Sequence, residues 1–128
     1  MTRDQEIAWA AGLFEGEGSI CYSFNSSSWC SHHWIAQLGM TDEDAVRRFH
    51  EAVGGIGNVN VRKPRDRNGT HRKTLWNWKC SKQDDLLAFV SLMGPLLCAR
   101  RQRSANDCLH DLARHHELFE QILAEQKR

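Results

Sequence analysis

The 128-residue chain is poor in several of the features that assign proteins to large classes. It contains no apolar run long enough to span a membrane and no apolar N-terminal segment typical of signal peptides. It also lacks internal repeats, linkers and low-complexity segments, and proline occurs only 2 times. These absences predict one soluble domain over residues 1–128, with no membrane partner. We expect it in the cytoplasm, or in the organellar matrix if it is organelle-encoded.

Cysteine is present at 5 positions, but without the pattern of a disulfide framework or a standard zinc site. The count is odd and no CxxC pair occurs, so reduced structural thiols are expected. A zinc site at Cys30, His32 and His33, completed by Cys21 or Cys80, is the alternative, although this spacing fits no standard pattern. The chain also lacks a glycine-rich phosphate loop and an evident Ser/His/Asp order.

A strong net charge is absent as well, since the sum is only +1, but the charges are unevenly distributed. Acids concentrate near the two ends and at residues 42–44. Residues 62–79 carry a basic cluster opposed by Asp66 alone: Arg62, Lys63, Arg65, Arg67, Arg72, Lys73 and Lys79. Arg100, Arg101 and Arg103 form a second cluster. Such polarity is expected where one face of a protein meets nucleic-acid phosphates.

The spacing of apolar residues predicts an α+β domain with the order αββαββα and a C-terminal helical region. Helices are expected over residues 4–16, 41–53, 81–93 and, as one helix or two, 97–124. Strands are expected over residues 19–25, 32–40, 57–62 and 73–80. Thr2 or Asp4, Thr41 and Ser81 are the predicted N-cap residues. Four such strands form an antiparallel sheet with one face packed on helices and the other free.

Alternation along the strands assigns each residue to one of these two faces. The apolar face, which should pack on the helices, includes Ile20, Tyr22, Phe24, Trp34, Ala36, Leu38, Met40, Val59, Val61, Trp76, Trp78 and Cys80. The free face includes Ser19, Cys21, Ser23, Asn25, His33, Ile35, Gln37, Asn60, Arg62, Lys73, Leu75, Asn77 and Lys79. Its polar and cationic members are of the kind that read base edges and contact phosphates, and a curved sheet can enter a major groove. We therefore predict that the free face binds double-stranded DNA, with Arg65 and Arg100 adding contacts. For any one residue, a solvated surface is the alternative.

The segment from Trp9 to Ile20, WAAGLFEGEGSI, is the most informative in the chain. It is an apolar helical pattern with small residues on one stripe, and it ends in Glu15 and Glu17. Small residues allow two helices to approach closely. Carboxylates at a helix C-terminus oppose the helix dipole, and a divalent cation would relieve that cost. The alternative for both acids is a solvated position at a helix end.

This segment resembles the motif of the LAGLIDADG homing endonucleases. The nine motif positions fall on residues 10–18, and both acidic positions are filled by Glu. Ala11, Gly12, Leu13 and Gly18 match the motif, while Ala10, Phe14 and Gly16 depart from it. The order of elements to about residue 107 also resembles this family. The resemblance implies the homing-endonuclease fold, in which a saddle-shaped four-stranded sheet receives DNA.

The resemblance also implies roles for individual residues. Glu17 matches the acid that binds the catalytic metal, expected to be Mg²⁺ with Mn²⁺ as a substitute, and the carbonyl of Gly16 faces the same metal. Glu15 matches the first acid, which more often supports the helix junction or the surroundings of the metal. Arg101 best matches a basic residue near the scissile phosphate, with Arg100 as the other candidate. Either arginine could instead contact backbone phosphate or lie in solvent.

One motif supplies one such acid, so the resemblance implies a homodimer. Trp9, Gly12, Leu13 and Gly16 would pack on the same helix of a second copy. The expected function is a site-specific DNA endonuclease that makes a metal-dependent double-strand break in a long, near-palindromic target, as in intron homing. Two alternatives stay open: a catalytically silent DNA- or RNA-binding protein, such as an intron maturase or a transcription regulator, and a structural dimerisation module.

Overall fold

The structure, a computed structural model, describes residues 1–24, 32–63 and 73–126. The elements are α1 (Arg3–Glu17), β1 (Gly18–Phe24), β2 (His32–Met40), α2 (Glu43–Ala52), β3 (Asn58–Arg62), β4 (Leu75–Cys80), α3 (Gln83–Met93), the short 3₁₀ helix η1 (Gly94–Leu96) and α4 (Ala99–Gln126). The predicted order αββαββα with a C-terminal helix is confirmed, and α4 is one continuous helix. Among the described residues, no helix combines the length and the apolar character needed to cross a membrane.

Two of the predicted N-caps are wrong by one residue. At α1, Thr2 is the cap and forms a full capping box with Gln5. At α2 the cap is Asp42 rather than Thr41, because the Asp42 carboxylate accepts a hydrogen bond from the N–H of Ala45 at 3.2 Å. At α3 the cap position is Lys82 rather than Ser81 and makes no side-chain hydrogen bond. Two acids in the first turn of α3 supply the favourable charge there.

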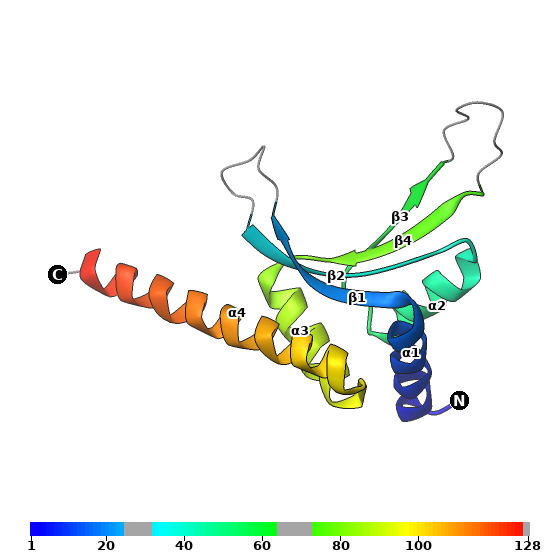
Figure 1. The fold of residues 1–128 in the computed structure, drawn as a ribbon, viewed down its shortest axis with the longest axis horizontal. Coiled ribbons are helices and arrows are strands. Elements are labelled where there is room, and N and C mark those ends of the chain that lie inside the picture. The colour runs from blue at the N-terminus through cyan, green and yellow to red at the C-terminus, as the bar shows by residue number, and fades with distance from the viewer. Residues whose placement is uncertain (25–31, 64–72, 127–128) are drawn as a thin grey trace.

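The four strands form one antiparallel sheet in the order β1-β2-β4-β3. Figure 1 shows the helices on one side of this curved sheet, whose two ends rise to give a saddle. Among the described residues, no helix lies on the other face of the sheet (Figure 1). The distal part of α4 extends away from the body of the domain (Figure 1).

Four aromatic rings fill the space between the sheet and the helices. Trp78 of β4 is fully buried and packs against Phe89 of α3 and Phe49 of α2, with ring centroids 4.7 and 4.9 Å away. Phe14 of α1 lies 5.2 Å from Phe89. The indole N–H of Trp78 donates to the carbonyl of Ile56 at 2.8 Å, so the buried ring leaves no polar atom unsatisfied.

The predicted core face of the sheet is confirmed at its centre, where the buried residues are Ile20, Ala36, Leu38, Trp78 and Cys80. The prediction is wrong at Tyr22 and Val61, which are 48% and 46% exposed. Two of the tryptophans on this face lie at the margin of the core. Trp34 and Trp76 are only partly buried. The indole N–H of Trp34 donates to the Asp111 carboxylate on α4 at 2.9 Å. The guanidinium of Arg47 lies 5.2 Å from the ring centroid of Trp76. Both rings therefore join the sheet to a helix through a polar contact as well as through apolar area.

Replacing Gly18 with alanine should destabilise the domain by about 1–3 kcal/mol. A Cβ at this position would collide with the ring of Phe14, which is 0% exposed and has no room to move. Urea unfolding measures the effect. Ser19→Ala, one residue further along β1 but on the free face, is the control and should change the free energy of unfolding by less than about 0.5 kcal/mol. Equal stability of the two variants would contradict the packing described here.

Candidate functional site

The strand register gathers polar residues into rows across the free face of the sheet. Residues directly opposite each other in an antiparallel pair point to the same side. Ser19 is opposite Gln37, Gln37 is opposite Lys79, and Lys79 is opposite Asn58, which makes one row across all four strands. The row begins on β1, two residues after the end of α1. This face therefore offers hydrogen-bonding and cationic groups in a fixed order.

A second row consists of Gly39, Asn77 and Asn60. A Cβ at Gly39 would lie 2.5 Å from Oδ1 of Asn77 and 3.8 Å from Cδ2 of Leu75. The missing side chain at Gly39 thus leaves room for the Asn77 amide to lie across β2. The row is thereby pre-ordered by its own packing, before any ligand is present.

The remaining residues predicted to bind DNA fall partly within the described structure. Cys21 is opposite Ile35, Ser23 is opposite His33, and Arg62 is opposite Leu75. Lys73 and Arg100 are exposed, the first just before β4 and the second at the start of α4. Asn25 and Arg65 lie outside the described residues.

Glu17 stands at the junction between α1 and the sheet. It is the last residue of α1, and β1 begins at the next residue without a connecting loop. Its side chain is exposed and makes no hydrogen bond or ion pair within the described part of the chain. No basic residue occupies the last turn of α1. The Glu17 carboxylate is therefore an uncompensated negative charge at the negative end of a helix dipole.

Glu15, in contrast, is held by the start of α4. Its carboxylate accepts a hydrogen bond from the N–H of Cys98 at 3.2 Å and pairs with Arg101 at 3.8 Å. Nε of Arg101 also donates to the main-chain carbonyl of Glu15 at 3.0 Å. That carbonyl lies in the last turn of α1, where helical carbonyls lack partners, so Arg101 acts as a C-terminal cap from a distant helix. Of the two arginines considered from sequence, Arg101 contacts the end of α1, while Arg100 is exposed.

The small residues of α1 leave an open strip on its surface. A Cβ at Gly12 or at Gly16 would meet nothing within 4 Å, and both residues are exposed. Ala8 is exposed one turn earlier on the same side. Leu13 is partly buried and packs against the core. The strip formed by Ala8, Gly12 and Gly16 could accept a closely packed helix.

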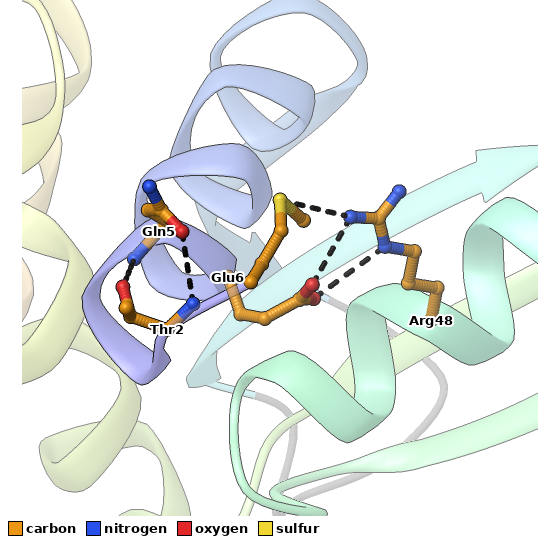
Figure 2. A network of polar contacts seen from close by, with 5 residues as sticks. Thr2, Gln5, Glu6 and Arg48 are labelled. Carbon is orange, nitrogen blue, oxygen red and sulfur yellow. Dashed lines mark hydrogen bonds and ion pairs between the residues drawn. The ribbon is translucent and has the colours of Figure 1, made fainter.

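Trp9, also predicted for this interface, is engaged within the chain. The guanidinium of Arg48 on α2 lies 4.0 Å from the centroid of the Trp9 ring. Arg48 also bonds both carboxylate oxygens of Glu6 on α1, at 3.1 and 3.4 Å, and Figure 2 shows this contact beside the capping box of Thr2 and Gln5. One face of the Trp9 ring therefore serves the packing of α1 on α2.

Within the described residues, no group of three or more His, Cys, Asp or Glu side chains is placed to hold a metal ion. Among the described residues, Glu17 is the one free carboxylate at the end of α1. The version of the alternative zinc site that uses Cys80 is divided by the sheet, because Cys80 is on the helix-covered face while His33 is on the free face. Burial, reinforced by Asp85 and Cys108, raises the pKa of the Cys80 thiol to about 12, which disfavours the thiolate that zinc requires. Cys30 lies outside the described residues.

No protein-family model matches the chain, and no curated protein matches it in sequence. Solved structures do match. The homing endonuclease I-CvuI, in complex with its target in the presence of Ca, has a TM-score of 0.66 and 17% identity, covering 87% of this chain and 68% of that chain. The homing endonuclease I-TnaI has a TM-score of 0.59 and 16% identity, covering 91% and 75%. The LAGLIDADG meganuclease I-AabMI, bound to uncleaved DNA, has a TM-score of 0.57 and 14% identity, covering 89% and 37%. The chain thus has the fold of the LAGLIDADG homing endonucleases, as its motif predicted.

Replacing Arg101 with glutamine should lower the free energy of unfolding by about 1–2 kcal/mol, because it removes a charge-assisted bond to the Glu15 carbonyl. Urea unfolding measures this loss. Arg100→Gln, one residue earlier and exposed, is the matched control and should stay within about 0.5 kcal/mol of the native protein. If both variants unfold alike, Arg101 does not cap α1.

Proposed function

We propose that the chain is a site-specific DNA endonuclease, acting as a homodimer that makes a metal-dependent double-strand break in a near-palindromic target. The observation that carries this proposal is the position of Glu17. An exposed and uncompensated carboxylate ends α1 at the point where the polar face of the sheet begins. A protein that only bound DNA would gain nothing from a negative charge beside its phosphate-binding surface.

The residues at the end of α1 fit a divalent metal such as Mg²⁺. Hard cations prefer carboxylate and main-chain carbonyl oxygens together with water. Glu17 would supply the carboxylate, and Gly16, exposed and without a side chain, would supply its carbonyl. When bound, such a metal stabilises the charge that develops on the phosphate oxygens during hydrolysis. Mn²⁺ has similar ligand preferences and is expected to substitute.

A second copy of the chain would complete the site. The strip of Ala8, Gly12 and Gly16 is open, and two-fold packing through it would bring the C-terminal ends of two α1 helices together. Each copy would then contribute one Glu17, and each sheet would cover one half of the target. A two-fold protein reads a near-palindromic sequence because both halves are met by the same side chains.

Each part of the chain has a distinct task in this proposal. Arg101 holds the last turn of α1 through the Glu15 carbonyl, which fixes where Glu17 points. The row of Ser19, Gln37 and Lys79 would contact the bases and phosphates nearest to Glu17. Rows further along the strands would read base pairs further from the cut. Arg101, as a cation that does not lose its proton, would add positive charge near the scissile phosphate rather than remove a proton.

The solved structures of similar fold support DNA and divalent metal as partners. I-CvuI was crystallised with its target in the presence of Ca, and in a second structure with the I-CreI target in the presence of Mg, where the DNA was not cleaved. In the second structure, the fold, the DNA and Mg were present together, yet the DNA was not cleaved. A catalytically silent DNA- or RNA-binding protein therefore stays the alternative that the experiment must distinguish.

Glu17→Gln should abolish cleavage while the folded structure and DNA binding are retained. The test incubates a randomised duplex library with purified protein and Mg²⁺ and sequences the cut ends. The native protein should cut at one near-palindromic motif, with cleavage by Glu17→Gln lower by at least about a hundredfold. Glu125→Gln, an exposed acid on α4, is the control and should cut like the native protein. Sequence-specific enrichment without any cleavage by the native protein would instead establish the silent DNA-binding protein.

Gly12→Leu should convert the dimer to a folded monomer. The added side chain has space within one chain, since a Cβ at Gly12 meets nothing within 4 Å, but it would block close packing of two α1 helices. Sedimentation equilibrium measures the mass and far-ultraviolet circular dichroism the fold. Ala88→Leu, a small exposed residue on α3, is the matched control and should remain dimeric. A native protein that stays monomeric with its DNA would overturn the proposed assembly.

A further inference from the structure

One row of the free face differs in chemistry from its neighbours. Cys21 on β1 is directly opposite Ile35 on β2. Their chain neighbours Ile20 and Ala36 are buried on the helix side, so this pair belongs to the face of the sheet that no described helix covers. The rows before and after it are Ser19 with Gln37 and Ser23 with His33. Cys21 is exposed and Ile35 is partly exposed. The pair is therefore an apolar patch between the polar pair of Ser19 with Gln37 on one side and His33 on the other.

Packing among the described residues does not account for this patch. Isoleucine favours strands, but exposed strand positions on a solvated face are usually polar, because alternation puts the apolar side chains in the core. The other apolar side chain of this face, Leu75, has a local role, since it lies beside Asn77 in the space above Gly39. Ile35 lies one residue beyond the end of the β2–β4 pairing, which starts at Ala36, so no paired β4 residue flanks it.

We infer that Ile35, with Cys21 beside it, reads a thymine in each half of the target through contact with the C5-methyl group. This inference rests on the proposed function, with the free face lying in the major groove, which a curved antiparallel sheet can enter. The thymine methyl is the one apolar group that unmodified base pairs present in that groove, and apolar side chains are its usual partners. The polar side chains of Ser19, Gln37 and His33 would read neighbouring base pairs by hydrogen bonds.

The position of this thymine follows from the strand geometry. Cys21 comes four residues after Glu17, and the chain is strand from Gly18 onward. Four residues of strand span roughly 13 Å, which is close to four base-pair steps of about 3.4 Å each. The thymine should therefore lie about four base pairs outward from the cleaved phosphate, once in each half-site.

The experiment replaces thymine by 2′-deoxyuridine, which removes only the methyl group. After the target has been identified by cleavage or enrichment, duplexes with single and symmetry-paired replacements are compared for binding in Ca²⁺. The native protein should lose affinity about fourfold for one replacement at the predicted position and about fifteenfold for the pair, the value expected for one buried methyl per half-site. Replacements elsewhere should have smaller effects.

Two variants assign the effect to Ile35. Ile35→Ala should bind the thymine and deoxyuridine duplexes equally, with its remaining affinity near that of the native protein for the deoxyuridine pair. Val61→Ala, an exposed apolar strand residue on the opposite face, is the control and should keep the native preference for thymine.

Failure of the inference and failure of the proposed function give different results. Three results would overturn only the inference about thymine and leave the proposed function intact. These are specific binding that does not depend on the methyl group, a target without thymine near that position, and an Ile35→Ala variant that keeps the preference for thymine. Absence of any sequence-specific DNA binding by the native protein would overturn both.

Discussion

The close contact between Gly18 and Phe14 is the constraint on which the rest of the structure depends. Because Gly18 has no side chain, the ring of Phe14 can lie directly beneath the point where α1 passes into β1. The ring also joins the aromatic cluster around Trp78, so the core of the domain is fastened to this junction. A loop between helix and strand would have left the last turn of α1 free to move relative to the sheet. Direct continuation, packed from below, fixes its position instead.

That junction positions two polar features, the Glu17 carboxylate and the first row of the free face. The open strip of Ala8, Gly12 and Gly16 ends at the same turn that carries Glu17, while the first row of the free face starts at Ser19. Arg101 completes the arrangement from the other end of the chain by capping the carbonyl of Glu15. A surface for a second helix, a free carboxylate and a hydrogen-bonding face thus meet within a few residues. That coincidence distinguishes the site more than any single residue in it.

Much of this arrangement could be predicted from the sequence because it is local. Period-two alternation identifies which strand residues share a face without knowledge of the partner strand, and the register agrees with it from Ser19 to Lys79. The N-cap of α2 was misplaced because Thr41 and Asp42 are both good caps and spacing alone does not separate them. The contact between Arg101 and Glu15 joins residues 86 positions apart, and no local pattern signals such a pairing. The partial burial of Trp34 is likewise a tertiary property, because it depends on how the helices pack beneath the sheet.

The electrostatics of α1 connect the proposed dimer with the proposed metal. Within one chain, Arg101 offsets the charge of Glu15 and caps a carbonyl, but Glu17 has no described partner. Packing two such helix ends together would add the repulsion of two Glu17 carboxylates to the unfavourable end of two dipoles. A divalent cation held by these carboxylates would offset that repulsion. Dimer formation and metal binding would then favour each other by mutual linkage. The sheet would contribute separately to the affinity for DNA, because its lysine and arginine side chains attract DNA phosphates whether or not the metal is present.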